Sequence, residues 1–336
     1  MRRKTLLVGL GLNLFASVFG QSKVGTTSAP FLGISIGPRA AAMGGAFTGV
    51  SDDATALYYN PGGISRAGTM NLILSHTDWL LGTRLNWLGF VLNLDGNNAI
   101  GVALTQLDYG EEEVTTVQQP EGTGERWDAS DLALTLSYAR NLTDRFSIGG
   151  SAKYVQIKIW NESASALALD VGLLFTTPFK GMKLGMSISN FGTDMRLDGR
   201  DLLRRIDLDP EREGHNEAIV SKLKTDGWPL PLFFRVGVAM EVLRIQNNRL
   251  TLALDALRPS DNVETLNAGC ELVLSEMVCL RGGYKSFLNQ DSEEGLTAGM
   301  GLRFGRGSRM AWSVDYTFTS FGILEDVHMI AVGFGF

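Results

Sequence analysis

The sequence has little of the material on which several common protein classes depend. Only two cysteines and three histidines occur in 336 residues, which disfavours a disulfide framework and a zinc site. No cluster of lysine and arginine stands out and the net charge is −6, which disfavours nucleic acid as a partner. Beyond residue 19 no run of 18 apolar residues occurs, and the mean hydropathy of +0.05 excludes a bundle of membrane helices.

Glycine is abundant instead, with 40 residues, and it follows no Gly-X-Y period. Hydrophobic residues make up 44% and charged residues 20% of the chain, which excludes a disordered chain. Near-neutral hydropathy combined with many short alternating segments is typical of a transmembrane β-barrel, because lipid-facing apolar residues alternate with lumen-facing polar ones.

The N-terminus has the pattern of a secretory signal peptide. Arg2, Arg3 and Lys4 form a positive start, residues 5–19 are mostly apolar, and the small residue Gly20 permits cleavage. The apolar stretch is shorter than the roughly 20 residues that a spanning helix needs. We therefore expect residues 1–20 to be removed on export, with an uncleaved membrane anchor as the alternative interpretation.

From residue 70 onward the chain is a succession of alternating segments. In one of them Phe234, Val236 and Val238 share one face, while Arg235 and Gly237 share the other, which predicts a strand. Most segments reach the roughly 9–11 residues of a tilted transmembrane strand. We predict an antiparallel barrel of fourteen strands, at 70–79, 82–94, 98–109, 129–141, 145–160, 163–177, 181–192, 231–243, 248–258, 263–274, 277–287, 293–304, 308–320 and 325–336.

The connections between these segments give an independent test. If the N-terminal segment starts in the periplasm, all even-numbered connections are short, and the two longest, 110–128 and 193–230, are both extracellular. Outer-membrane barrels have short periplasmic turns and long outer loops. An even strand number also returns the C-terminus to the periplasm. There, the alternation that ends in Phe334 and Phe336 resembles the signal by which the barrel-insertion machinery recognises its clients.

Two local features of the strands can be predicted in more detail. The apolar parity within 145–160 changes at Val155, which indicates a β-bulge near Tyr154. A turn at 274–276 that places Val273 opposite Met277 and Cys279 opposite Glu271 would point Cys270 and Cys279 to opposite faces of the sheet. A disulfide needs converging Cβ atoms, so we expect two free thiols.

The segment before the first strand differs from the rest of the chain. Residues 30–66 are rich in glycine and alanine, contain Pro30, Pro38 and Pro61, and allow short helical turns such as 38–43. We expect this segment to form a plug in the lumen. The predicted organisation is a signal peptide at 1–20, an N-terminal extension and plug at 21–69, and an all-β outer-membrane barrel at 70–336.

The plug segment also carries the most specific motif. Residues 31–66 resemble the N-terminal region of the PorV/PorQ family, within the FadL-like group of fourteen-stranded outer-membrane barrels. The matching pieces are Gly37-Pro38-Arg39, Met43-Gly44-Gly45-Ala46, Asp52-Asp53-Ala54 and Tyr59-Asn60-Pro61-Gly62-Gly63. Residues 76–80 are similar to that family's first strand, and residues 280–285 are similar to a strand motif near the end of these barrels.

The resemblance implies one of two functions. PorV-like members act in type IX secretion, where they engage the translocon and the surface-attachment complex and receive cargo with C-terminal signal domains. FadL-like members pass hydrophobic small molecules such as long-chain fatty acids and carry an Asn-Pro-Ala motif in an N-terminal hatch. Here Asn60-Pro61-Gly62 departs from that motif, which weakens the transfer of residue roles from the fatty-acid branch.

Charged side chains that the alternation places in the lumen are balanced in sign, so no single-sign ring of the kind that selects ions is present. We expect internal salt bridges and plug contacts, with a polar conduit as the alternative. The predicted plug-anchoring residues are Arg39, Asp52, Asp53, Asn60 and Pro61, for which ordinary turn chemistry is the alternative. The predicted lumen charge network consists of Asp131, Lys153, Asp170, Arg235, Glu241, Asp255, Glu271, Arg281, Arg303 and Asp315.

No pattern indicates catalysis. His76 and Asp78 share a face, but no nucleophile elbow accompanies them, and we expect no catalytic residues, no metal and no cofactor. His76 and His328 should be near neighbours, because first and last strands adjoin in a closed barrel. The charged loop 193–230 is the leading candidate for a protein contact, although charge runs are usually solvated.

We therefore expect a barrel in the outer membrane of a Gram-negative bacterium. The leading hypothesis is a non-enzymatic scaffold or shuttle in type IX secretion and surface attachment, and the alternative is a FadL-like transporter. Expected partners are outer-membrane lipid, the barrel-insertion machinery, the secretion translocon, attachment-complex proteins and signal-domain cargo.

Overall fold

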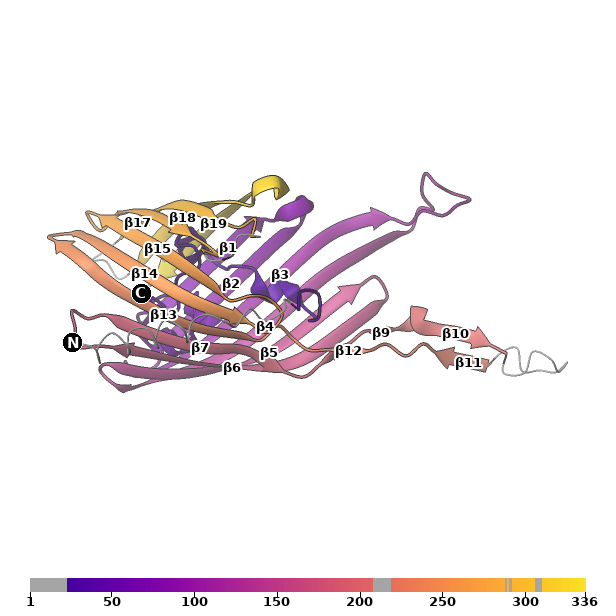
Figure 1. Ribbon diagram of the computed structural model, residues 1–336, viewed down its shortest axis with the longest axis horizontal. Helices are drawn as coiled ribbons and strands as arrows, with labels where there is room; N and C mark the ends of the chain where they lie inside the picture. Colours follow the sequence, from indigo (N-terminus) through magenta and orange to yellow (C-terminus); the bar gives the residue numbers. More distant parts are fainter. Residues whose placement is uncertain (1–22, 208–218, 288, 290–291, 306–309) are drawn as a thin grey trace, which may run out of the picture.

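The computed structural model describes residues 23–207, 219–287, 289, 292–305 and 310–336, so the predicted signal peptide lies outside it. Fourteen antiparallel strands form one sheet, in which β1 pairs with β19 and β5 pairs with β6, so that the sheet closes into a barrel (Figure 1). None of the helices in the described part is long and apolar enough to span a membrane.

The strands confirm the prediction from alternation, and their ends differ from the predicted ones by at most four residues. They are β1 (Met70–Asp78), β2 (Arg84–Asn93), β3 (Asn98–Glu113), β4 (Arg126–Thr143), β5 (Phe146–Ile159), β6 (Glu162–Thr176), β7 (Lys183–Gly192), β13 (Phe233–Ile245), β14 (Asn248–Pro259), β15 (Thr265–Leu274), β16 (Val278–Tyr284), β17 (Leu296–Phe304), β18 (Ala311–Ser320) and β19 (Asp326–Gly335).

The two ends of the barrel differ in the length of their connections. At one end the strands join through short turns, and the chain also finishes there (Figure 1). At the other end β3 and β4 extend into a long hairpin, and residues 193–207 and 219–232 form an arm. Since short turns face the periplasm in outer-membrane barrels, the long loops face the outside. The arm contains β8 (Met195–Arg196), β9 (Asp198–Gly199), β10 (Leu203–Ile206), β11 (Ile219–Lys222) and β12 (Gly227–Trp228).

The β-bulge predicted near Tyr154 is wrong. The register of β5 against both neighbours is regular through this point, and the only shift between β4 and β5 lies at Asn141 to Thr143, near the periplasmic turn. Val155 is fully buried because it faces the lumen, where it packs in an apolar cluster. The change in apolar parity therefore marks an apolar stretch of the inner wall rather than a break in the strand.

The two cysteines are free, as predicted, although the predicted register is wrong. Leu274 pairs with Val278, which places Cys279 opposite Val273 and Cys270 opposite Gly282. The turn spans three residues because Ser275 and Glu276 both adopt positive φ, at 50° and 58°. The cysteines still lie on opposite faces, since their spacing is odd and period 2 governs the strands on either side.

The N-terminal segment crosses the lumen from the outer mouth to the periplasmic end. At the outer mouth the Ser28 amide donates to the Pro229 carbonyl at 2.8 Å, and the Thr27 hydroxyl donates to Asp261 at 2.6 Å. At the periplasmic end Arg66 donates to the Asp144 carbonyl in the β4–β5 turn. Between these points lie η1 (Pro30–Gly33), α2 (Pro38–Ala42), α3 (Ala56–Tyr59) and η2 (Pro61–Arg66), which together form the plug. The short helical turn predicted at 38–43 is confirmed by α2.

The plug packs closely against the wall. Phe31, Leu32 and Leu57 are buried against apolar side chains of β2 to β6. Wall glycines allow close approach: a Cβ at Gly172 would lie 2.2 Å from Asn60 Oδ1. Two cavities between plug and wall measure only about 10 and 20 Å³, which leaves no room for more than a water molecule in either.

The path of the plug predicts that the segment before Ala29 is reachable from outside the cell. Val24 is 69% exposed at the outer mouth. In intact cells a membrane-impermeant maleimide should therefore label Val24→Cys. Asn97→Cys, in the exposed periplasmic turn between β2 and β3, should react only after the outer membrane is permeabilised. The wild-type chain measures the background from its two native thiols, and labelling of Asn97→Cys alone would contradict the proposed direction of the plug.

Candidate functional site

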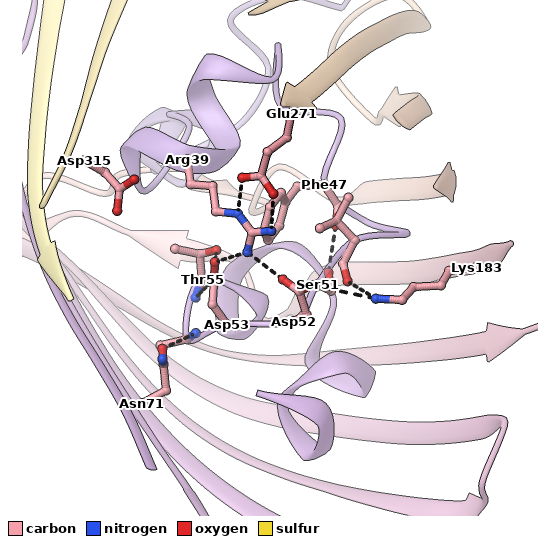
Figure 2. Close-up of polar contacts among 12 residues, drawn as sticks. Arg39, Phe47, Ser51, Asp52, Asp53, Thr55, Asn71, Lys183, Glu271 and Asp315 are labelled. Carbon is pink, nitrogen blue, oxygen red and sulfur yellow. Dashed lines mark hydrogen bonds and ion pairs between the residues drawn. The ribbon is translucent and has the colours of Figure 1, made fainter. Parts of the chain in front are cut away.

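Arg39 joins the plug to the barrel wall (Figure 2). It lies on α2, and its Nε and Nη2 donate to the two carboxylate oxygens of Glu271 on β15, at 2.8 and 2.9 Å. Its Nη1 donates to Asp52 at 2.6 Å and to Asp53 at 2.8 Å. The planar guanidinium thus binds one wall carboxylate in a bidentate manner while it holds two carboxylates of the plug, a geometry that lysine could not reproduce.

The aspartates bind Arg39 within the plug, and Asp53 also organises a turn. Asp53 Oδ1 accepts a hydrogen bond from the Thr55 amide at 2.9 Å, which organises the turn that leads into α3. The adjacent Ala54 amide donates to Asn71 Oδ1 on β1 at 2.8 Å, so this turn is also tied to the wall (Figure 2). The turn chemistry expected of Asp53 is therefore present, and an anchoring role for the Asp52-Asp53 pair stays a prediction.

On the wall side, Glu271 is the centre of a cluster of charges. Its side chain is only 2% exposed, and it also accepts a hydrogen bond from Arg281 Nε at 2.8 Å. Arg281 in turn donates from Nη1 to Asp315 at 2.6 Å. Arg303 and Arg249 lie further away, at 3.7 and 3.8 Å from Glu271. Arg249 is absent from the predicted set, although the inward parity of Thr251 and Asp255 on β14 extends to it.

The electrostatic environment favours the charged forms of the plug residues. Burial by itself raises the pKa of Asp52, but the positive charges of Arg39 and Lys183 outweigh it and lower that pKa to about 2. Burial by itself lowers the pKa of Arg39, but Asp52, Glu271 and Asp53 together raise it well above its ordinary value. Both groups are therefore ionised at neutral pH.

The remaining predicted lumen charges belong to separate contacts. Lys153 pairs with Asp170 at 2.8 Å, and both are buried. Asp255 accepts hydrogen bonds from the plug amides of Phe47 and Thr48, at 3.0 and 2.8 Å. The ten predicted residues thus all face the lumen but do not form one network.

Three further members of the predicted set make contacts of other kinds. Arg235 lies over the rings of Tyr58 and Phe233, with its guanidinium carbon 5.3 and 4.9 Å from their centroids. Asp131 accepts a hydrogen bond from the Tyr109 hydroxyl at 2.8 Å. Glu241 binds Arg244, three residues along the same strand. Alternation placed these residues on the correct face but could not give their partners.

Asn60 fixes the plug near the periplasmic end. Its Nδ2 donates to the Leu173 carbonyl on β6 at 2.8 Å and to the Thr48 carbonyl at 2.9 Å. Its Oδ1 accepts a hydrogen bond from the Gly62 amide at 3.1 Å and so caps η2, in which Pro61 is the first residue. Asn60 is completely buried, so each of its polar atoms requires such a partner.

The terminal aromatics lie at the periplasmic rim of the β1–β19 seam. Phe334 on β19 pairs with Leu72 and Trp312 on the strands at either side. The Phe336 amide donates to the Met70 carbonyl at 3.0 Å, which extends the pairing to the end of the chain. Their role as an insertion signal remains a prediction.

His76 and His328 lie on neighbouring strands, as predicted. His76 is on β1 and His328 on β19, where it pairs with Asp78 of β1. His76 contacts Asn86 at 2.7 Å and Asp78 at 3.4 Å on the outward face of the wall. His328 instead contacts the Tyr316 hydroxyl at 2.8 Å. Within the described part of the chain, no three His, Cys, Asp or Glu residues are placed to hold a metal ion.

Removal of the Arg39 guanidinium should destabilise the plugged barrel. In Arg39→Gln, Asp52 and Asp53 lose their close cation and Glu271 loses its bidentate partner, which should cost about 3–5 kcal/mol of unfolding free energy. Urea unfolding of the detergent-solubilised protein measures this loss. Arg244→Gln is the control, because it breaks a pair in which Arg244 is 65% exposed, and it should have little effect. Equal stability of Arg39→Gln and the wild type would contradict an anchoring role.

The lowered pKa of Asp52 predicts a pH-dependent contribution to stability. Because the folded pKa is about 2 and the ordinary value is 3.8, this contribution is complete above about pH 4 and is lost as the pH falls toward 2. The stability difference between the wild type and Asp52→Asn should therefore be constant from pH 7 to about pH 5 and shrink below about pH 4. Urea midpoints across this range test it, and a difference that persists unchanged at pH 2 would refute it.

Comparison with known proteins identifies a family model that matches the chain. Residues 18–199 match a family model described as type IX secretion system protein PorV. No curated protein sequence matches the chain.

Solved structures are similar in fold. The CymD monoaromatic hydrocarbon channel is 12% identical with a TM-score of 0.57, and the match covers 89% of this chain and 97% of CymD. The toluene transporter TodX of Pseudomonas putida is 13% identical with a TM-score of 0.54, again with 89% and 97% of the two chains covered. At this identity the likeness shows the fold alone. The match to the family model, however, spans more than half of the sequence, and the chain therefore belongs to the PorV family of type IX secretion system proteins.

Proposed function

We propose that this outer-membrane barrel is a non-enzymatic scaffold or shuttle in type IX secretion, which presents a partner-binding arm outside the cell. The observation that carries the proposal is the plug that occupies the lumen. The plug is attached at the outer mouth, at Glu271 and at the periplasmic turn, and the two cavities enclosed between it and the wall are about the size of a water molecule. A barrel whose lumen is occupied by a plug acts through its exposed surfaces. The most prominent of these lie at its outer end.

The outer arm has the properties of a protein contact. Its β10–β11 hairpin lies well beyond the barrel mouth (Figure 1) and exposes the aliphatic side chains of Leu203, Ile206, Ile219 and Val220. A two-stranded hairpin has little stability on its own, and exposed apolar side chains of this kind are typical of interaction sites. The charged residues of the arm at 208–218 lie outside the described part of the chain.

The base of the arm is held to the barrel. β9 pairs with the start of β6, and the Asp201 amide donates to Glu162 at 2.7 Å. Asn161 donates from Nδ2 to Asp201 at 2.9 Å. The hairpin is therefore presented from a fixed base, which suits a platform that receives cargo and hands it to attachment proteins.

The described cavities do not favour the alternative, transport of hydrophobic small molecules. A site for a small ligand usually needs about 300 Å³ or more. The two cavities enclosed between plug and wall are more than tenfold smaller. The larger cavities of the lumen lie at its periplasmic end and are lined by charged side chains. The likeness to CymD and TodX concerns the fold, and we therefore keep transport only as an outcome of the experiment below.

We also propose that residues 1–20 are cleaved on export. An uncleaved anchor would hold residue 20 in the inner membrane, whereas Thr27 contacts Asp261 at the outer mouth of the barrel. Seven residues reach at most about 25 Å, which cannot span the periplasm and the outer membrane. The position of the plug therefore supports cleavage over anchoring.

Replacement of residues 203–222, the β10–β11 hairpin, by a short Gly-Ser turn should abolish secretion function without unfolding the barrel. The variant keeps β8, β9 and β12 and so leaves the base of the arm intact. We expect normal heat-modifiable folding, loss of co-purifying secretion partners, and signal-domain cargo that remains unexported. The control shortens the other long outer hairpin at 114–125.

Normal export in the arm variant would refute the proposed role of the arm. In a strain that lacks the whole protein, unchanged export would refute the secretion function itself. Slower fatty-acid uptake with normal export in that strain would assign the protein to transport instead.

A further inference from the structure

The periplasmic end of the lumen contains an open vestibule. It consists of two cavities of about 360 and 350 Å³ that share Arg39, Asp52 and Arg249 as lining residues. The first extends toward Arg303 on β17 and the aromatic side chains at the rim of β18 and β19. The second extends toward Lys183 and the short turn between β6 and β7. Each is large enough for a small ligand, unlike the cavities on the outer side of the plug.

The vestibule has an excess of positive charge. Six cationic side chains and five carboxylates line the two cavities. Arg281 lies directly behind them, buried, and contributes its charge to Glu271 and Asp315. This local excess is opposite in sign to the net charge of the chain, which is −6. A concave site with such an excess raises the local concentration of anions.

The excess positive charge lies on Arg249 and Arg303, because no carboxylate among the described residues accepts a hydrogen bond from either side chain. Arg39 and Arg281 occupy Glu271 with hydrogen bonds of 2.8–2.9 Å. Arg249 and Arg303 approach the same carboxylate only to 3.8 and 3.7 Å, beyond hydrogen-bond distance. Arg249 Nε is buried and has no hydrogen-bond partner. Both side chains are about a quarter exposed, at 26% and 25%, so they line the cavity with donors available.

We propose that this vestibule binds a phosphate group between Arg249 and Arg303. Guanidinium groups bind phosphate through paired N–H donors, and a phosphate carries the one to two negative charges that the excess requires. The same cavity borders Phe304, Trp312 and Phe334, and the rings of Phe304 and Trp312 stack at 4.4 Å. Aromatic side chains of this kind mark the membrane interface. The phosphate can therefore come from an inner-leaflet phospholipid headgroup or from free phosphate in the periplasm.

Titration of the purified, detergent-solubilised barrel with inorganic phosphate tests the site, at constant ionic strength and with chloride as the reference anion. We expect saturable heat of binding in the wild type. Arg249→Gln and Arg303→Gln should each weaken the affinity at least tenfold. Arg258→Gln is the matched control, because Arg258 lies at the opposite end of the same strand as Arg249 and is 66% exposed, and it should bind like the wild type.

Heat-modifiability confirms that each variant is folded, and Arg249→Lys, which keeps the charge, provides a second variant should Arg249→Gln fail to fold. Absence of saturable phosphate binding in the wild type, or equal affinity in wild type and both glutamine variants, overturns the proposal. Native mass spectrometry after reconstitution with phosphatidylglycerol or phosphatidylcholine then separates the sources. If phosphatidylglycerol is retained and its retention depends on Arg249, the ligand is a lipid headgroup. If inorganic phosphate binds but phosphatidylglycerol is not retained, the ligand is free phosphate. Neither result depends on the secretion function, which the export experiment tests separately.

Discussion

The structure depends on a buried carboxylate on the barrel wall, Glu271, that the plug binds with a bidentate cation. Glu271 is 2% exposed, and a carboxylate in such a position is strongly unfavourable unless cations and hydrogen bonds surround it. The wall supplies Arg281, which is already shared with Asp315. The plug supplies Arg39, whose guanidinium completes the coordination and at the same time binds Asp52 and Asp53. The position of α2 in the lumen is thereby fixed by charge as well as by packing.

The plug has two different faces, and the wall has matching ones. Toward β2 to β6 it presents Phe31, Leu32 and Leu57, and the wall there contributes small or apolar residues such as Ala133 and Val155. Toward β13 to β18 it presents Arg39 and the amides of Phe47 and Thr48, and the wall answers with carboxylates. Because the apolar face and the charged face of the plug each match only one part of the wall, the plug fits the lumen in one orientation. The abundant glycine serves the same end, since wall positions such as Gly172 leave room for plug backbone.

The sequence was sufficient to predict the strands because lipid imposes an apolar residue at every second position of each of them. It was not sufficient where that rule was extended to the inner face. The apolar Val155 imitates a bulge in the alternation because the plug makes that part of the lumen apolar. The Cys270 to Cys279 hairpin was placed in the wrong register because the length of its turn depends on the left-handed backbone of Ser275 and Glu276.

The candidate site, like the strands, could be predicted only in part: its residues could be identified, but not their partners. Alternation and the family motif identified Arg39, Asp52 and Glu271, but no periodicity reports that Arg39 and Glu271, 232 positions apart, meet across the lumen. Likewise Glu241 and Arg249 both face inward and line the same cavity, yet Glu241 binds a neighbour on its own strand, whereas Arg249 lies 3.8 Å from Glu271 on the next strand. Partners across a barrel are set by strand tilt and by the fold of the plug, and neither is local in sequence.

The way in which the plug is held also limits where the molecule can act. Displacing it would uncover the Glu271 cluster, break the Asn60 and Asp255 contacts, and expose the apolar cluster against β2 to β6. Each of these would cost several kcal/mol, so their combined loss exceeds what one partner contact ordinarily supplies. Function is therefore confined to the two ends of the barrel. At the outer end the chain exposes a hairpin with aliphatic side chains, and at the periplasmic end it exposes a vestibule with unsatisfied arginines, so the two proposed binding surfaces differ in chemistry.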